Sequence, residues 1–422
     1  MIRNRSFAIV LAGVLTAATP SFATNGDNLI GIGPISRALG GTGIAAPQDA
    51  ISAVFANPAA MCFTPGCAFS EVNLAITAFM PDISAEADLG PMGNYKADSK
   101  SKVYPIPAIG ISMPLDKETR RWRLGLSAYG VSGLGVDYRG TSLDGTLQTP
   151  LPPPMDRVPK IEGVLTDLMI MKLAPSLAWQ ATPNFSLGAA VHVDYARLDL
   201  RNGTKDAWGA GFQFGALYKP TTDLALGLTV ITPQSTKFDG VVNYFGTGRD
   251  LELESPTTIG AGVGYTTMDG RLLLTVDGKW LNWSSTDGYG DFDWKDQWVV
   301  GAGIQYEAIP DKLFLRLGYN FGSNPLKGNN GWGGGSRNVQ GMDFPDYYYE
   351  SFRLIGFPAI VEHHLTAGIG YAFSEKFEIN LAYVHAFEAT MSESGSFGGM
   401  VPAKLSSSLS EDTIDLGLTW RF

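Results

Sequence analysis

Three basic residues stand where a charged side chain is unusual and could bind an acid. Lys172, Lys279 and Arg316 each lie in a strand-like stretch, on the face opposite to their apolar neighbours. In mostly apolar surroundings a cation can hold the carboxylate of a ligand through charge-assisted hydrogen bonds. The alternative is pairing with interior acids such as Asp194 or Asp277. Pairing is the favoured interpretation, because Asp277 and Lys279 are two residues apart and share a strand face.

The histidines do not suggest a reaction centre. His192 and Asp194 could form a dyad, but no nucleophile motif accompanies them. His363 and His364 are adjacent, so on a strand they point to opposite faces and make a poor metal pair. The sequence contains no G-x-S-x-G, no H-E-x-x-H and no phosphate loop. We therefore expect no enzyme, no metal and no cofactor.

Two cysteines, Cys62 and Cys67, lie in the stretch CFTPGC with a Pro-Gly turn between them. In an oxidising compartment such a pair forms a small disulfide loop. A metal pair is the alternative, but all four histidines lie far along the chain. The sequence therefore predicts a disulfide.

The N-terminus indicates that the chain is secreted. MIRNR carries two arginines, FAIVLAGVLTAA is an apolar run of about a dozen residues, and SFA is a small-x-small cleavage pattern. These features predict a signal peptide over residues 1–23 and a mature chain that begins at Thr24; a buried core helix is the alternative. The chain has 41 acidic and 31 basic side chains. A net negative charge argues against nucleic acid as a partner.

The composition after the signal suits a protein that crosses a membrane with strands. No run of 18 apolar residues, which a membrane helix needs, follows residue 23. Charged residues are 17% of the chain, below the usual quarter, while aromatic residues are 11% and glycine occurs 51 times. In a transmembrane β-barrel only alternate residues face lipid, so the apolar signal is diluted along each strand.

Alternation with period two recurs along residues 69–422. It is clearest in TIDLGLTWRF, where Leu416, Leu418 and Trp420 share one face. About fourteen such segments predict an all-β fold, a 14-stranded antiparallel transmembrane β-barrel. A soluble β-sandwich is disfavoured, because the second face carries small residues rather than charges. The longer connections are expected near residues 81–102, 137–164, 202–206, 235–250, 284–292, 322–362 and 391–410.

The chain end and the expected lumen add two predictions. Phe422 closes the last strand as a terminal aromatic, which resembles the signal read by the barrel-assembly machinery; we expect that partner, outer-membrane lipid and a monomer. The N-terminal segment, residues 24–68, is too short for its own core and should plug the barrel as a hatch. Within it, Asp49 should cap a short helix that Pro58 ends. Expected lumen positions that leave room for it are Gly209, Gly211, Gly215, Gly260, Gly262, Gly264, Gly368 and Gly370.

The segment GIGPISRALGGTGIAAPQDAISAVFANPAAM resembles the hatch of the FadL family of outer-membrane transporters for long-chain fatty acids and other hydrophobic compounds. The family spacing of Gly, Arg-Ala, Gly-x-Gly, Asp-Ala and Asn-Pro-Ala is present. The resemblance implies a hatch that closes the barrel and rearranges when substrate binds. The residues that carry it are Arg37, Ala38, Gly41, Gly43, Asp49, Ala50, Asn57, Pro58 and Ala59.

The resemblance also implies a mechanism. Substrate is caught on extracellular loops, enters a pocket in the barrel and leaves sideways through a gap made by a kinked third strand. Here that strand reads LSAYGVSGLGVDY, and Gly130, Gly133 and Gly135 would weaken its ladder and allow a bulge. Glycines that only curve the barrel are the alternative. The proline-rich loop 137–164 is a candidate for part of the capture groove.

The expected function is uptake of hydrophobic molecules through the bacterial outer membrane without chemistry. The three cations favour long-chain fatty acids as substrate. The alternatives are aromatic hydrocarbons carried by the same fold, a general-diffusion porin, and a lipase built on a barrel, which would need a serine beside His192.

Overall fold

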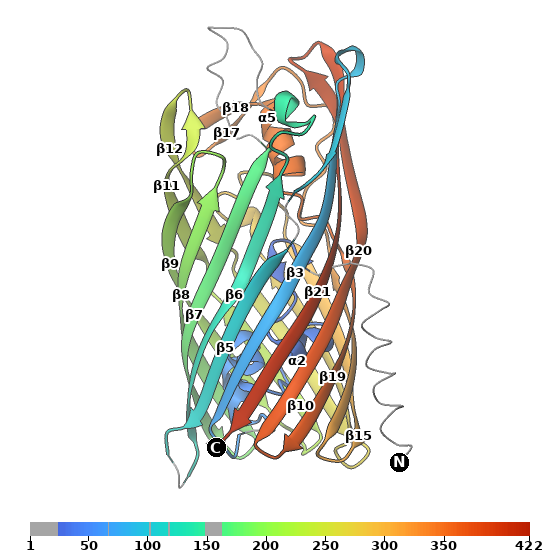
Figure 1. The fold of residues 1–422 in the computed structure, drawn as a ribbon. Helices are drawn as coiled ribbons and strands as arrows, with labels where there is room; N and C mark the ends of the chain where they lie inside the picture. The colour runs from blue at the N-terminus through green and yellow to red at the C-terminus, as the bar shows by residue number, and fades with distance from the viewer. Residues whose placement is uncertain (1–23, 66, 101–102, 117–118, 148–162) are drawn as a thin grey trace, which may run out of the picture.

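A closed antiparallel barrel of fourteen strands forms the body of the protein in the computed structural model (Figure 1). Each barrel strand pairs with the next one along the chain, and β21 closes the ring by pairing with β3. The barrel strands are β3 (Glu71–Asp88), β5 (Tyr104–Pro114), β6 (Trp122–Asp137), β7 (Leu165–Thr182), β8 (Phe185–Asp199), β9 (Lys205–Tyr218), β10 (Leu224–Ile231), β13 (Thr258–Thr267), β14 (Leu272–Leu281), β15 (Gln297–Ile309), β16 (Leu313–Gly322), β19 (His363–Ser374), β20 (Phe377–Phe397) and β21 (Val401–Arg421). The structure describes residues 24–65, 67–100, 103–116, 119–147 and 163–422.

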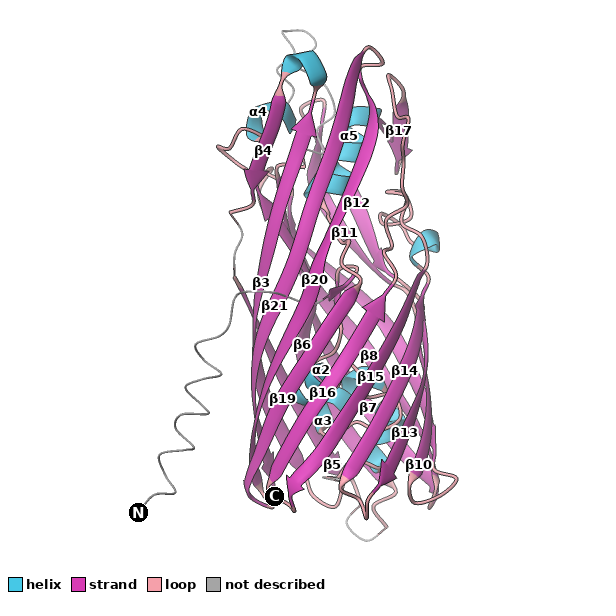
Figure 2. Ribbon diagram, turned by 90° about the vertical axis from the view of Figure 1, so that its right-hand side faces the viewer, coloured by secondary structure: helices cyan, strands magenta, loops and turns pink. Residues whose placement is uncertain are grey.

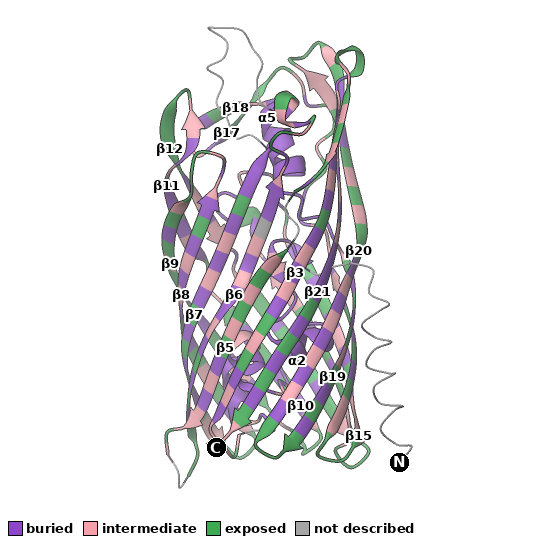
Figure 3. Ribbon diagram, viewed as in Figure 1, coloured by how far each residue is buried: buried purple, intermediate pink, exposed green. Residues whose placement is uncertain are grey.

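The alternation predicted from the sequence is confirmed along the wall. On β21, Leu416, Leu418 and Trp420 are exposed on the outer surface, whereas Asp415 and Thr419 are buried inside. Figure 3 shows the same alternation of exposed and buried positions along neighbouring strands. Apolar side chains that point outward suit a lipid environment, and the inward ones line the lumen.

Several strands continue beyond the lipid-facing band, contrary to the predicted loops at 81–102 and 391–410. β20 and β21 have 21 residues each and β3 has 18. At about 3.3 Å per residue, 21 residues span roughly 70 Å, against an apolar band of about 25 Å. The polarity of the two faces is reversed there, because Ala403, Leu405 and Leu409 point inward and are buried. The outward positions are polar and form cross-strand pairs such as Thr390 and Ser408, 2.7 Å apart. β4 (Asn94–Asp98) extends this region beside β3.

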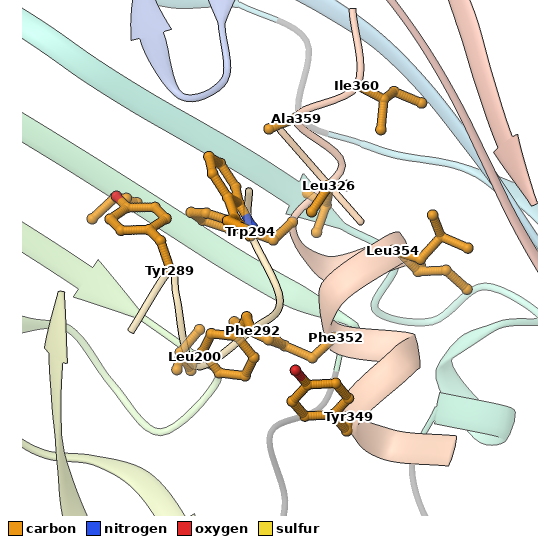
Figure 4. Packing of buried hydrophobic residues seen from close by; sticks show 14 of the residues in the cluster. Leu200, Tyr289, Phe292, Trp294, Leu326, Tyr349, Phe352, Leu354, Ala359 and Ile360 are labelled. Atoms are coloured by element: carbon orange, nitrogen blue, oxygen red, sulfur yellow. The ribbon is translucent and has the colours of Figure 1, made fainter. Parts of the chain in front are cut away.

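Insertions between barrel strands fold together at the end of the barrel with the long connections. They bury an aromatic and aliphatic core in which Tyr289, Phe292, Trp294, Tyr349 and Phe352 pack closely (Figure 4). These insertions contain η2 (Gly90–Met92), α4 (Asp144–Leu147), β11 (Gln234–Tyr244), β12 (Thr247–Ser255), η3 (Trp283–Ser285), β17 (Ser336–Val339), β18 (Met342–Pro345), α5 (Asp346–Ser351) and η4 (Phe352–Gly356). Residues 148–162 of the candidate capture loop lie outside the described part of the chain.

The N-terminal segment lies inside the barrel, where its short helices are visible through the wall (Figure 2). In its core, Ile51, Val54 and Met61 pack with Tyr129 and Ala174 of the wall. Among the described residues, no helix has the length and apolar character needed to cross a membrane. The elements of the segment are β1 (Thr24–Asn25), β2 (Asn28–Leu29), α2 (Pro34–Ala38), α3 (Ala50–Ala56) and the 3-10 helix η1 (Pro58–Cys62).

Small wall residues make room for the segment. A Cβ atom on Gly215 of β9 would overlap the side-chain oxygen of Asn57, and one on Gly188 of β8 would overlap the backbone of Ala59. Any larger residue there would push the segment away from the wall. Five of the predicted lumen glycines contact the N-terminal segment in this way, namely Gly215, Gly260, Gly262, Gly264 and Gly368. The other three do not, because Gly209 and Gly211 face β11 and Gly370 faces Asn380 and Arg316.

Candidate functional site

Arg37 ties the N-terminal segment to the wall. Its side chain is fully buried, and its Nε lies 3.0 Å from Asp415 Oδ1 on β21. Its Nη2 donates to Thr413 Oγ1 at 2.8 Å, and its Nη1 donates to the carbonyl of Gly31 at 3.2 Å. The guanidinium thus joins helix α2, the preceding loop and the last barrel strand through one buried ion pair.

The turn after α2 holds a wall carboxylate with its backbone. Gly41 has a φ of +76°, and a Cβ atom there would overlap the carbonyl of Ile30, so glycine is needed. The N–H groups of Gly43 and Ile44 donate to Asp277 Oδ2 at 2.7 and 2.9 Å. Both predicted glycine positions therefore shape a contact with β14.

The predicted helix cap is present. Asp49 precedes α3, and its Oδ1 accepts a hydrogen bond of 2.9 Å from the N–H of Ser52 in the first turn. Pro58 occupies the first position of η1, where a missing N–H is harmless. The chain therefore turns at this proline from one short helix into the next, rather than leaving the lumen.

The Asn-Pro-Ala stretch is clamped between the segment and strands β8 and β9. Asn57 Oδ1 accepts from the N–H of Ala59 at 3.1 Å, and Asn57 Nδ2 donates to the carbonyls of Ile44 and Ala216 at 2.8 and 3.1 Å. The carbonyl of Ala59 accepts from Ser186 Oγ at 2.8 Å. Each polar group of this stretch thus has a partner that fixes the end of the segment to the wall.

A cavity of about 100 Å³ lies between the N-terminal segment and the wall. Its apolar lining includes Leu29 and Phe55 from the segment and Tyr129, Val131 and Leu281 from the wall. The segment therefore forms part of the boundary of the space that a substrate could occupy. A molecule that passes through the lumen must displace some of these groups.

Two of the three predicted cations, Lys172 and Lys279, line this cavity. Lys172 Nζ lies 3.2 Å from Asp194 Oδ1 in a buried ion pair and also contacts Gln234 Oε1. Lys279 differs, because no carboxylate of the described residues lies within ion-pairing distance of it. Its Nζ is 3.5 Å from the carbonyl of Gly41 and 5.9 Å from the centre of the Phe55 ring.

Arg316 does not share this cavity. It lies among polar groups near the turn-rich end of the barrel, where its Nη2 is 3.7 Å from Glu378 Oε1. Its Nε donates to Gln305 Oε1 and its Nη1 to Asn380 Oδ1, both at 2.6 Å. The arginine is thus fully partnered, as the pairing interpretation expects.

The positions of His192, His363 and His364 agree with a structural role. His192 lines the cavity, and its Nε2 is 3.2 Å from Gln213 Oε1. His364 is buried while His363 is exposed, in agreement with opposite strand faces. Within the described ranges, no group of three or more histidine, cysteine, aspartate or glutamate side chains is arranged to hold a metal ion.

The wall ladder is interrupted between β5 and β6. Their pairing runs only as far as Ala108 and Tyr129, although β5 stays paired with β3 up to Tyr104. Beyond that point β6 is paired with β7, with a shift in register between Gly130 and Ser132. The third strand of the barrel therefore carries the bulge that the glycines predicted, in its ladder with β7, at the level where β5 no longer pairs with its other edge.

The sequence analysis missed a second cause of this interruption. β5 carries Pro105 and Pro107 in the unpaired stretch, and proline cannot donate a ladder hydrogen bond. The two prolines in YPIPAIGISM were the signal that could have identified it. Part of the vacant edge of β6 is taken by the N-terminal segment, because Asn28 of β2 pairs with Ser132.

Side chains of β5 cover the glycines of β6. A Cβ atom on Gly135 would overlap the hydroxyl of Tyr104, and one on Gly130 would lie 2.5 Å from Ile106 Cγ2. Gly133 differs, since its nearest neighbour would be a backbone oxygen at 3.6 Å. The interruption is thus filled by two side chains rather than by backbone hydrogen bonds.

An aromatic cluster lies above the cavity, in the connection between β14 and β15. The ring centres of Trp283, Tyr289 and Trp294 are 4.7 to 5.0 Å apart, and all three side chains are buried. The Tyr289 hydroxyl donates to Asp27 of the N-terminal segment, which also accepts from Ser132 Oγ at 2.9 Å. One carboxylate therefore links the aromatic cluster, the segment and the bulged strand.

A buried charge cluster holds helix α5 in place above the barrel. Arg353 Nη2 lies 2.8 Å from Glu350 Oε2 and also contacts Glu393 of β20, and all three side chains are fully buried. Two carboxylates thus share one guanidinium. Burial raises the pKa of Glu350 to about 7, although the arginine opposes this shift.

The predicted disulfide is wrong, because Cys62 and Cys67 are free thiols. Cys62 is buried in the apolar cluster that also contains Val54 and Met61, and burial raises its pKa to about 12. Cys67 is partly exposed at the turn-rich end, where its carbonyl accepts a hydrogen bond of Arg123.

Comparison with known proteins agrees with this architecture. The family model described as "Outer membrane protein transport protein (OMPP1/FadL/TodX)" matches residues 10–205. A curated relative from Chlorobium limicola, an uncharacterised protein encoded in the 5′ region of a phosphoenolpyruvate carboxykinase gene, is 45% identical over 86 residues. That match covers 20% of this chain, and the chain spans about two fifths of the relative.

Solved structures match over nearly the whole chain. The toluene transporter TodX of Pseudomonas putida has a TM-score of 0.64 at 19% identity, covering 93% of this chain and 99% of that one. The toluene transporter TbuX of Ralstonia pickettii scores 0.63 at 16% identity, covering 94% and 99%. A FadL homologue of Pseudomonas aeruginosa scores 0.61 at 17% identity, covering 96% and 99%. At these identities the likeness concerns the fold.

The sequence match and the barrel agree on the class of protein. The matched residues include the whole N-terminal segment with its Arg37, Asp49 and Asn57 contacts, and the matching family is described as one of outer membrane transport proteins. Residues 10–205 therefore carry the sequence pattern of the OMPP1/FadL/TodX family of outer membrane transport proteins, and the whole chain shares the fold of the solved transporters.

Proposed function

We propose that the protein carries small, uncharged hydrophobic molecules, of the size of a monoaromatic hydrocarbon, across the outer membrane. The small cavity behind the N-terminal segment carries this proposal; its lining is mostly apolar and includes Lys172, Lys279 and His192. A cavity of 150 Å³ lined by apolar side chains is known to take up benzene, and the cavity here, at about 100 Å³, is of that scale. A long-chain fatty acid would need far more room.

The charges around the cavity support the same substrate class. A fatty-acid carboxylate needs a cation that is not already neutralised, yet Lys172 is paired with Asp194 and Arg316 lies elsewhere. Binding a second carboxylate beside Asp194 would bring like charges together in a buried site. The preference for fatty acids drawn from the sequence is therefore reversed. The toluene transporters TodX and TbuX, which share this fold, add support for hydrocarbons.

We infer a path that ends sideways in the membrane. A substrate in the cavity is adjacent to Val131, which lies in the bulge of β6, and the wall there is filled only by side chains such as Ile106. An apolar molecule gains about 25 cal/mol for each Å² removed from water, so exit into lipid is favoured over exit into the periplasm. The N-terminal segment would act as the hatch, since Leu29 and Phe55 must move to open the lumen.

Long-chain fatty acids remain the second candidate because of Lys279. Its ammonium lines the cavity and has no carboxylate partner among the described residues. If the segment moves and the cavity enlarges, this ammonium is placed to hold a carboxylate.

Equilibrium binding to the detergent-folded protein separates the two candidates. Toluene and palmitate are titrated against the wild type, Lys279→Met, and Arg316→Met as the matched control outside the cavity. Saturable toluene binding that is equal in all three proteins supports the hydrocarbon proposal. Saturable palmitate binding that weakens tenfold or more only in Lys279→Met supports the fatty-acid candidate. Binding of neither ligand, together with open-channel conductance in planar bilayers, would overturn both in favour of a porin.

A further inference from the structure

The side chain of Glu411 on β21 is buried in the lumen against the first residue of the N-terminal segment. It is 1% exposed, and its two carboxylate oxygens accept from Thr24 Oγ1 at 2.7 and 2.8 Å. The backbone N–H of Thr24 donates to the same carboxylate. Thr24 itself is only 2% exposed. One residue of the segment thus aims two donors at a single buried acid.

Glu411 lacks the ion pair that two other lumen acids have. Asp415, four residues along β21, is paired with Arg37 at 3.0 Å, and Asp194 is paired with Lys172 at 3.2 Å. In the described part of the chain, no lysine, arginine or histidine side chain comes within 4 Å of Glu411. A buried carboxylate that lacks a compensating charge is costly, so this position calls for a positive group.

We propose that Glu411 is the receptor for the α-ammonium group that signal-peptide cleavage creates on Thr24. Hydrolysis of the Ala23–Thr24 bond adds one water, which leaves a carboxylate on the released peptide and a protonated amine on Thr24. The nitrogen that becomes this ammonium is the one that already donates to Glu411. A free α-amino group has a pKa near 8 and is therefore charged at neutral pH. Cleavage thus converts a lone buried acid into an ion pair.

Cleavage of the signal peptide would therefore fix the N-terminal segment in its position in the lumen. Thr24 pairs with Leu29 in the β1–β2 hairpin, and Leu29 lines the cavity. An anchor at Thr24 therefore holds one wall of the cavity, while Arg37 and Asp415 hold the next helix against the same strand. Before cleavage the amide nitrogen of Thr24 carries no charge, so its contact with Glu411 is weaker. This inference does not depend on which molecule is transported.

The first test uses the protein purified from outer membranes. Intact mass and peptide mass spectrometry identify the first residue, which should be Thr24. The folded protein is then treated with an amine-acetylating reagent at pH 7.5, and acetylation of the N-terminal peptide is followed with time. In Glu411→Gln the α-amine should react at least tenfold faster than in the wild type. Asp412→Asn is the matched control, because Asp412 binds Tyr383 on the other face of the strand and should leave the rate unchanged.

A second test does not rely on the reactivity of the amine. One alanine is inserted between Ala23 and Thr24, which moves the ammonium out of the site. The temperature at which the folded barrel converts to its unfolded form on gel electrophoresis is then measured. Glu411→Gln should lower this temperature in the native-length chain and have no further effect in the extended one. A mature chain that starts elsewhere, a wild-type amine that reacts as fast as in Glu411→Gln, or equal losses in both backgrounds would overturn the proposal.

Discussion

Replacement of Arg37 by methionine should release the N-terminal segment while the barrel itself stays folded. The substitution leaves Asp415 buried with no positive partner. Removing one partner of a buried ion pair typically costs about 3–5 kcal/mol. Asp415 retains hydrogen bonds from Thr77 and Thr413, so the lower figure of ~3 kcal/mol applies here. That cost falls on the contact between segment and wall, because the strand ladders that hold the barrel are untouched.

A cost of ~3 kcal/mol lowers the ratio of seated to released segment by roughly two orders of magnitude, since 1.36 kcal/mol corresponds to a factor of ten. Single-channel conductance in planar bilayers should therefore show frequent open events in Arg37→Met that are rare in the wild type. The double variant Arg37→Met, Asp415→Asn removes both charges and should recover much of the closed behaviour. A single variant as closed as the wild type, with unchanged protease resistance of residues 24–68, would refute the assignment of Arg37 as an anchor.

Three further predictions follow from other contacts. Gly215→Val should displace Asn57 from the wall and raise conductance, whereas the heat resistance of the barrel should change little; an unchanged conductance would contradict the close approach. Burial raises the pKa of Glu350 above its unfolded value of 4.5, so ionising this side chain costs more in the folded state and the stability of the protein should fall between pH 5 and pH 8. In thermal unfolding, Glu350→Gln should flatten this fall, and a pH profile identical to that of the wild type would argue against the assignment. In the folded protein a maleimide should modify Cys67 and leave Cys62 unmodified, as read by peptide mass spectrometry, and absence of any free thiol would show that the disulfide forms after all.

Much of the wall could be predicted because it depends on local geometry. Side chains of a strand alternate between two faces, so TIDLGLTWRF alone indicated which residues meet lipid. The helix cap at Asp49 and the turn into η1 at Pro58 are equally local, because each involves groups within three residues. The extended parts of β20 and β21 were missed because the polarity of their faces is reversed there, with Leu405 and Leu409 inward and polar residues outward.

The partners of the buried charges could be foreseen only in part. Lys172 does pair with Asp194, which lies opposite it on the next strand. Asp277 and Lys279 share a face as expected, yet the described contacts of Asp277 are with the backbone of Gly43 and Ile44, more than 230 residues away. Spacing along one strand shows which side chains are neighbours, but it does not show which residues from distant parts of the chain bind them in the folded protein.

The order of residues is enough to predict a barrel with alternating faces and a glycine-rich N-terminal segment before it. The size of the cavity, the ladder interruption beside Pro105 and Pro107, the separate thiols and the contact between Thr24 and Glu411 became known from the folded chain. The physical reason is the distance along the chain between the groups that interact. Strand alternation and capping depend on neighbours along the chain, whereas cavities, ion pairs and disulfides depend on distances between segments that meet only when the barrel closes around the segment.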